Sequence, residues 1–134
     1  MKRAIFNVLR AALRGIDPKS IGHIHAHGLA TQESDQQEAE AIAECFGAAN
    51  TQPPVTTIKG HIGNLGAGGG MVEMIASLSS LGGDLFPIRN LSELDPACPI
   101  HACTTAGTPA GDRFININIT PQGQASAVCI QRFQ

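Results

Sequence analysis

A histidine at the end of a predicted strand is the first feature of this 134-residue sequence that could carry chemistry. His27 and Gly28 come soon after the short apolar run 21–24, which is typical of a strand. A helix is predicted shortly after this turn, over residues 35–47, and it ends at a glycine. Because open α/β sheets place their chemistry at the carboxyl ends of strands, the imidazole of His27 is a candidate for a chemical role.

Two further histidines precede His27 at alternating positions. His23, His25 and His27 share one face of an extended strand, and imidazoles recur as zinc ligands, so a metal cluster is an alternative. However, no cysteine or aspartate follows at ligand spacing. We therefore predict no metal site and no cofactor. A metal-binding module built on the three histidines is kept as the weakest of three functional hypotheses, and the other two are given below.

A glycine-rich stretch occupies residues 59–70, between a predicted strand at 55–58 and a predicted helix at 71–81. A strand, a glycine-rich loop and a helix in this order can bind phosphate. The sequence contains neither GxxxxGK[ST] nor GxGxxG here, so a nucleotide phosphate site is not favoured. The glycines instead allow backbones to pack closely.

Composition narrows the class of protein. The chain is 43% hydrophobic, lacks Trp and Tyr, and has a net charge of -2, which predicts one globular domain over residues 1–134. No basic patch for nucleic acid and no apolar run long enough for a membrane span is present. The four cysteines lack CxxC spacing, which favours reduced thiols and a cytoplasmic location.

The elements that must position these residues indicate an α/β fold. An amphipathic helix is predicted near the N-terminus, where apolar residues recur every three or four positions before Gly15. Residues 113–119 alternate with period two, and a second apolar run covers residues 125–130 after turn residues. This pair predicts an antiparallel hairpin.

Three segments resemble the second half of a β-ketoacyl-ACP synthase. HAHGLATQESDQQE is similar to the family pattern x-A-H-G-T-x-T-x-x-N-D-x-x-E, with Leu29 and Ser34 as departures. Residues 55–73 align without a gap to V-S-S-T-K-S-x-x-G-H-x-x-G-A-x-G-x-x-E, and residues 86–96 resemble P-P-T-x-N-L-x-x-x-D-P. The resemblance implies the C-terminal half of the thiolase-like fold, a mixed sheet with antiparallel final strands and packed helices.

The resemblance also implies a decarboxylative Claisen condensation, in which two hydrogen-bond donors stabilise an enolate oxygen. In this alignment His27 is the first donor, and Asn64 stands where the family has its second histidine. Lys59 and Glu73 match the family's supporting ion pair. A rival register places His61 on the family histidine, but it needs a three-residue insertion and loses the lysine.

The leading functional hypothesis is the C-terminal domain of a β-ketoacyl-ACP synthase of fatty acid or polyketide synthesis. The nucleophilic cysteine of that family lies in the N-terminal half, so we expect this half as a partner and no activity from this chain alone. An acyl carrier protein bearing an acyl or malonyl thioester is the second expected partner, and a homo- or heterodimer is the expected assembly.

The alternative is a catalytically inactive partner of the chain-length-factor type. Asn64 cannot carry a proton as a histidine can, which favours this alternative. The family's terminal turn, G-F-G-G-x-N, is also replaced here by residues 120–125, which lack its phenylalanine.

Overall fold

One mixed sheet organises residues 1–133, the part of the chain that this computed structural model describes. Its five strands lie in the order β3-β2-β1-β4-β5. β1 pairs in parallel with β2 and β4, β2 pairs in parallel with β3, and β4 and β5 form the predicted antiparallel hairpin. The strands are β1 (His23–His25), β2 (Pro54–Thr56), β3 (His101–Ala102), β4 (Arg113–Ile119) and β5 (Ala125–Gln131).

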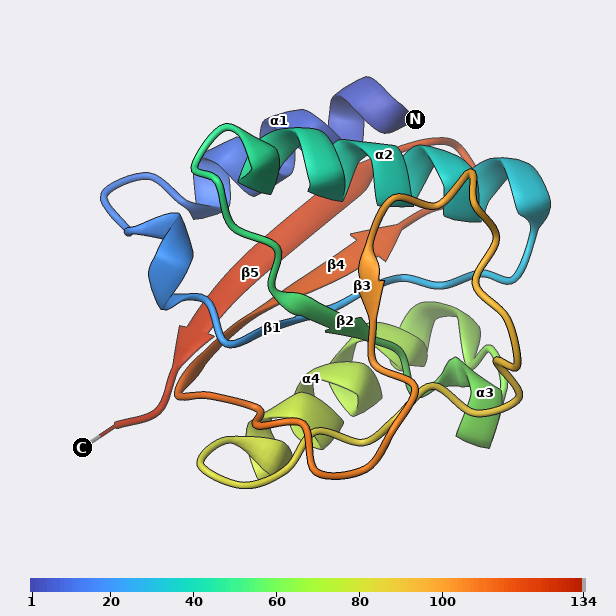
Figure 1. The fold of residues 1–134 in the computed structure, drawn as a ribbon. Helices are drawn as coiled ribbons and strands as arrows, with labels where there is room; N and C mark the ends of the chain where they lie inside the picture. The colour runs from blue at the N-terminus through green and yellow to red at the C-terminus, as the bar shows by residue number, and fades with distance from the viewer. Residues whose placement is uncertain (134) are drawn as a thin grey trace.

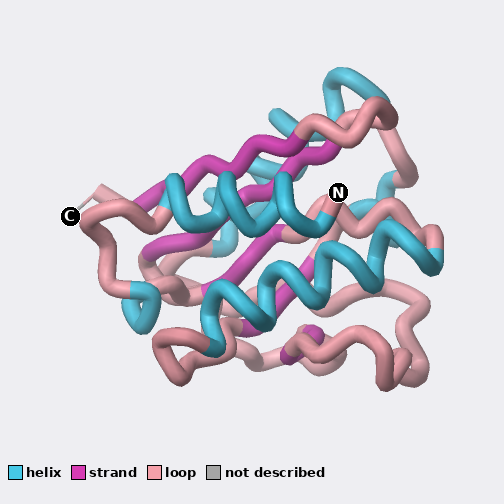
Figure 2. Tube along the Cα trace, turned by 90° about the horizontal axis from the view of Figure 1, so that it is seen from above, coloured by secondary structure: helices cyan, strands magenta, loops and turns pink. Residues whose placement is uncertain are grey.

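Helices cover both faces of the sheet (Figure 1). α1 (Lys2–Ala12) and α2 (Gln32–Gly47) lie side by side on one face, as the view from above also shows (Figure 2), and α4 (Gly69–Ser80) lies on the other. Three short helices complete the described chain: η1 (Pro18–Ser20), α3 (Lys59–Ile62) and η2 (Gly66–Gly68). No helix within residues 1–133 is long and apolar enough to cross a lipid bilayer.

Two expectations from the sequence are corrected at helix starts. α2 begins at Gln32 rather than at residue 35. Thr31, its N-cap, is the last extended residue, and the backbone is helical from the next residue onward. Residues 59–70 were expected as a loop but contain α3 and η2. Glycine frequency concealed these short helices, because glycine disfavours helix without excluding a single turn.

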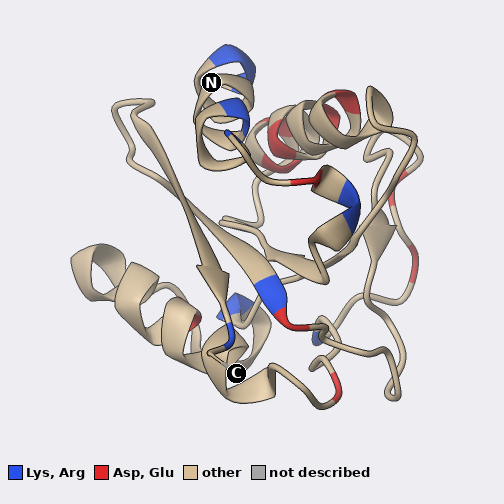
Figure 3. Ribbon diagram, turned by 90° about the vertical axis from the view of Figure 1, so that its left-hand side faces the viewer, with Lys and Arg blue, Asp and Glu red and all other residues tan. Residues whose placement is uncertain are grey.

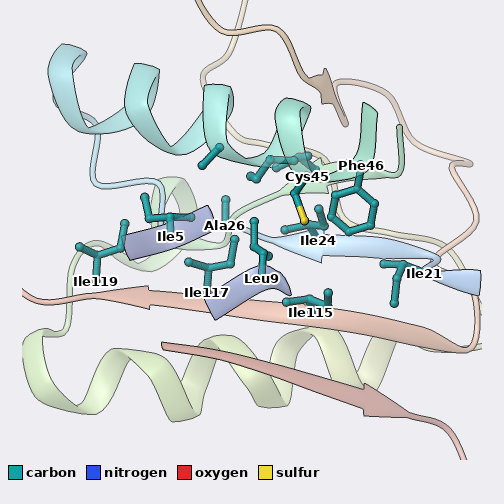
Figure 4. Packing of buried hydrophobic residues seen from close by; sticks show 13 residues of the cluster. Ile5, Leu9, Ile21, Ile24, Ala26, Cys45, Phe46, Ile115, Ile117 and Ile119 are labelled. Atoms are coloured by element: carbon teal, nitrogen blue, oxygen red, sulfur yellow. The ribbon is translucent and has the colours of Figure 1, made fainter. Parts of the chain in front are cut away.

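The hydrophobic core lies between the sheet and the pair α1 and α2 (Figure 4). β-strand alternation sends the isoleucines of β1 and β4 to this face, where the apolar side chains of both helices meet them. Cys45 of α2 is also buried in this core. The core includes Ile5, Leu9, Ile24, Phe46, Ile115, Ile117 and Ile119.

The opposite face of the sheet is polar yet buried. His23 and His25 of β1, Asn116 of β4 and Ser77 of α4 are each no more than 1% exposed. Buried polar groups need hydrogen-bond partners, so α4 must supply them.

The outer surface of α4 is apolar and exposed. Met71 is 63% exposed, Ile75 55% and Leu78 49%, and α4 contains one acidic and no basic residue (Figure 3). Exposed apolar side chains gathered on one side of a helix are typical of an interaction surface. Within residues 1–133, no further layer covers this surface.

Candidate functional site

The backbone around His27 is held by charged side chains from two other segments. The carboxylate of Glu38 on α2 accepts the N–H groups of His27 at 2.7 Å and Gly28 at 3.0 Å. Lys59 Nζ donates to the carbonyl oxygen of His27 at 2.6 Å. Gly28 has φ +54°, and a Cβ there would lie 2.9 Å from the side chain of Thr57, so both the conformation and the space require glycine. The His27 backbone therefore has one imposed position.

The ring of His27 is fixed by β4. The N–H of Ile119 donates to Nδ1 at 3.3 Å, so Nδ1 is unprotonated and the ring proton resides on Nε2. Burial, followed by the nearby charge of Lys59, lowers the pKa of His27 to about 4. At neutral pH the ring is thus an uncharged N–H donor with a single tautomer.

Lys59 and Glu73 form the ion pair that the sequence predicted. Lys59 Nζ contacts Glu73 Oε1, and the two side chains are only 9% and 1% exposed. Because Glu73 lies on α4, the pair connects this helix to the backbone of His27. The pairing is confirmed, whereas its part in catalysis stays a prediction.

A glycine at the start of α4 lets this helix approach the sheet. A Cβ on Gly70 would lie 2.9 Å from the side chain of Asn118 on β4. The neighbouring Asn116 donates through Nδ2 to the carbonyl oxygen of Gly70 at 3.2 Å. The predicted close packing of the glycine-rich segment is therefore present at this position.

Asn64 and His61 lie on the exposed segment between the end of β2 and α4. Asn64 Oδ1 accepts the N–H of Gly66 at 3.1 Å, which leaves the Nδ2 amide as its donor. Asn64 also borders a cavity beside Lys59 and Gly28. His61 Nε2 instead contacts the carbonyl oxygen of Pro87 at 3.2 Å. The convergence of Asn64 and His27 on one substrate atom stays a prediction.

His23 and His25 belong to a hydrogen-bond chain through Ser77. The N–H of Ile58 donates to His25 Nε2 at 3.2 Å, so His25 carries its proton on Nδ1 and donates it to Ser77 Oγ at 2.8 Å. The Ser77 hydroxyl then donates to His23 Nε2 at 3.0 Å, and His23 Nδ1 donates to the carbonyl oxygen of Ala110 at 2.7 Å. The N–H of Ile58 at one end and the carbonyl oxygen of Ala110 at the other end fix which group donates and which accepts at each step.

This hydrogen-bond chain accounts for the alternating histidines. All ring nitrogens of His23 and His25 take part in it, and the His23 ring stacks on Phe114 with centroids 5.1 Å apart. Burial, followed by the proximity of His23 and Lys59, lowers the pKa of His25 to about 3. The pair is therefore neutral and connects β1, α4 and the backbone just before Lys59.

Sequence reasoning gave no role to Glu38 or Ser77. Glu38 is the last residue of the quoted motif HAHGLATQESDQQE. Its match to the glutamate of the family pattern was the signal that could have identified it. Burial raises the pKa of Glu38 to about 7, against the opposing effect of the two N–H groups that it binds. Ser77 carried no local signal, because its partners are 52 and 54 residues away.

We expect His27 to remain neutral well below its ordinary pKa of 6.5 and to titrate near pH 4. As the pH falls, the unfolded chain binds this proton at a higher pH than the folded chain does. The His27 contribution to stability is therefore complete above about pH 6.5 and is lost as the pH falls towards 4. NMR of histidine-labelled protein should show the Nε2–H tautomer at pH 6.

A protonated His27 ring at pH 6 would contradict this expectation. Glu38 acts in the opposite direction, since its raised pKa makes stability fall as the pH rises from 4.5 to about 7. The variant His27→Gln separates the two, because it retains only the Glu38 contribution.

Comparison with known proteins identifies similar chains. The family profile described as "Beta-ketoacyl synthase, C-terminal domain" matches residues 1–91. A highly reducing polyketide synthase of Aspergillus niger is 32% identical over 100 residues, which are 73% of this chain and 4% of the relative. The 3-oxoacyl-[acyl-carrier-protein] synthase 2 of Staphylococcus aureus is 33% identical over 87 residues, 64% of this chain and 22% of the relative.

A solved structure has the same arrangement of elements. The ishigamide ketosynthase/chain length factor superposes with a TM-score of 0.90 at 23% identity, over 99% of this chain and 34% of that chain. This likeness confirms the predicted fold. The sequence described here spans about a third of that solved chain and a smaller share of the two relatives.

Proposed function

Because this chain belongs to the β-ketoacyl synthase family, as its C-terminal domain, we propose that it forms the donor half of a condensing enzyme of fatty acid or polyketide synthesis. The observation that carries the proposal is the fixation of His27. Glu38 binds its N–H, Lys59 binds its carbonyl oxygen, and the N–H of Ile119 binds its Nδ1. These contacts fix the ring and leave the neutral Nε2–H as its donor.

The proposed reaction is a decarboxylative Claisen condensation. A cysteine of the N-terminal half carries the acyl group as a thioester, and a malonyl thioester enters on an acyl carrier protein. Loss of CO₂ leaves a carbanion whose charge moves to the thioester oxygen, where His27 Nε2–H and the Asn64 amide donate hydrogen bonds. The enolate carbon then attacks the acyl thioester carbon, and the cysteine thiolate leaves.

Lys59 and Glu73 support this site without touching substrate. The Lys59 ammonium fixes the carbonyl oxygen of His27, and Glu73 holds the ammonium in place. Acyl carrier protein and a second synthase subunit are the partners, consistent with the names of the Staphylococcus aureus enzyme and of the ketosynthase/chain length factor. We place this assembly in the cytoplasm, as a homo- or heterodimer.

The experiment compares the 134-residue chain alone with the chain supplemented by a cysteine-bearing N-terminal ketosynthase half. Acyl and malonyl carrier proteins should yield no 3-oxoacyl product with the chain alone. Product should form with both halves, and His27→Ala should then reduce turnover by about 10²-fold, as removal of one oxyanion donor does in other enzymes. His61→Ala, on the same exposed segment as Asn64, is the matched control and should retain activity.

A second candidate is the inactive, chain-length-factor type of partner. The amide of Asn64 at the second donor position favours it, as does the absence of phenylalanine from residues 120–125. Under this alternative the chain associates with a complete ketosynthase and changes product length, and His27→Ala has no effect on turnover. Condensation by the 134-residue chain alone would contradict both candidates.

The apolar outer surface of α4 fits the proposed N-terminal half. We expect Ile75→Asp to weaken association of the two halves at least about tenfold, because a buried carboxylate without a partner is strongly unfavourable. The thermal midpoint of the chain alone should change little, since Ile75 is 55% exposed.

Isothermal titration calorimetry measures this association. Gln52→Asp introduces the same charge at an exposed position between α2 and β2 and should leave the affinity unchanged. Equal affinities of Ile75→Asp and the unmodified chain would show that another surface makes the contact.

A further inference from the structure

A cavity of about 500 Å³ lies between α2, β2, β3 and the segment 88–98. Its volume is in the range of small-molecule binding sites. Apolar side chains form most of its wall, and an unfilled apolar cavity costs stability in proportion to its volume. The wall includes Ala39, Ile42, Val55, Ile88, Leu91 and Leu94.

The charged groups around this cavity are mainly acidic. Asp35, Glu93 and Asp95 border it, whereas Arg89 is the basic residue available there, because Lys59 is paired with Glu73. Asp35 is half-buried, and its Oδ1 accepts the N–H of Ala30 at 3.2 Å, which orients the carboxylate.

The thiol of Cys98 lies near these carboxylates. Cys98 also lines the cavity. Burial raises the pKa of this thiol, and the negative charges of Asp95 and Asp35 raise it further. Because carboxylates outnumber the cationic groups that are free to act in its lining, the cavity disfavours an anion and favours a cation or a hydrogen-bond donor.

We propose that this cavity binds a small molecule with an apolar body and a primary ammonium end. The body lies along Ile42 and Leu94, and the ammonium donates to the carboxylate of Asp35. A primary ammonium has three N–H donors and no acceptor, which matches a carboxylate-rich surrounding. Asn64 and Lys59 also line this cavity, so the ligand lies beside the proposed donor site. Its chemical class differs from the thioesters of the proposed condensation, and its binding does not require that reaction.

The cavity adjoins the support of His27. Glu38, which binds the N–H groups of His27 and Gly28, also lines it. A cation in the cavity favours the ionised form of Glu38. In this form neither carboxylate oxygen carries a proton, so each can accept one of the two N–H groups. Occupancy of the cavity thereby tightens the turn that holds His27.

The experiment uses octylammonium, 1-octanol and octanoate as probes of one chain length. Their binding is measured by protection of Cys98 from alkylation, followed by mass spectrometry, with Cys129 on β5 as the internal reference. Octylammonium should protect Cys98 saturably and bind about tenfold more tightly than octanoate, as expected for a charge-assisted hydrogen bond. Alkylation of Cys129 should not change.

Two variants at matched positions on α2 test the recognition. Asp35→Asn is nearly isosteric and should reduce the affinity for octylammonium to that for 1-octanol. Glu44→Gln lies on the same helix but faces Lys2 at 3.3 Å, so it should leave both affinities unchanged. Ala39→Phe should fill the cavity and abolish protection by all three probes.

Three results would overturn the proposal. The first is equal or tighter binding of octanoate, and the second is unchanged octylammonium affinity in Asp35→Asn. The third is loss of protection in Ile75→Asp, which would place the probe on the apolar surface of α4. If Ala39→Phe does not fold, judged by circular dichroism, Asp35→Asn and the comparison of the three probes still decide the outcome.

Discussion

Glu73→Leu should lower the free energy of unfolding by about 3–5 kcal/mol, because it leaves the ammonium of Lys59 buried without its counter-charge. Lys59 is only 9% exposed, so water cannot replace the lost carboxylate. Lys59→Met should have a similar effect, since Lys59 is the partner of Glu73 Oε1 and Glu73 Oε2 has no hydrogen-bond partner within residues 1–133. Urea denaturation of the 134-residue chain measures both variants.

The double variant Lys59→Met with Glu73→Leu should recover most of this loss, because apolar replacements of a buried ion pair are often neutral. The remaining deficit should be about 1–3 kcal/mol, the cost of the carbonyl oxygen of His27 that loses its donor. Glu93→Leu, at an exposed glutamate, is the control and should change stability little. A double variant as unstable as the sum of the single variants would show that the two charges are not coupled.

Ser77→Ala should lower the free energy of unfolding by about 2–5 kcal/mol, since it leaves two buried imidazole nitrogens without partners. Ser77 Oγ is the link that both accepts from His25 and donates to His23. The backbone groups of Ile58 and Ala110 still fix both tautomers, so the ¹⁵N resonances of His25 Nδ1 and His23 Nε2, which face Ser77, should shift without a change of tautomer.

Matched variants on the same helix separate hydroxyl loss from helix effects. Ser79→Ala, at an exposed position of α4, should be neutral or slightly stabilising because alanine has the higher helix propensity. Ser77→Thr keeps the hydroxyl and should retain both ¹⁵N resonances, although its extra methyl group can cost stability. Unchanged ¹⁵N resonances of His25 Nδ1 and His23 Nε2 in Ser77→Ala would refute the hydrogen-bond chain.

The exposed surface of α4 and the fixation of His27 follow from the same architecture. α4 supplies Glu73 and Ser77 to the sheet on its inner side and exposes apolar residues on its outer side. A partner that covers the outer side would therefore sit on the helix that anchors the donor site. This arrangement gives a physical reason why association of the two halves and assembly of the site should occur together.

Elements with local signals were predictable from the sequence. Period-two alternation predicted the hairpin of β4 and β5, and spacing of apolar residues predicted α1. The ungapped family pattern also predicted the Lys59–Glu73 pair, because their separation of 14 positions is a fixed spacing in that pattern. Short β3 escaped prediction, since its two residues become a strand only by pairing with β2.

The roles of the three histidines depend on contacts between distant parts of the chain. Sequence spacing placed them on one strand face, which was compatible with a metal cluster. The fold brought Ser77 between His23 and His25, and it brought Ile119 to His27 across 92 residues. The tautomer of each ring is set by these distant backbone groups and hydroxyls, and no local pattern encodes which donor a neutral imidazole will meet.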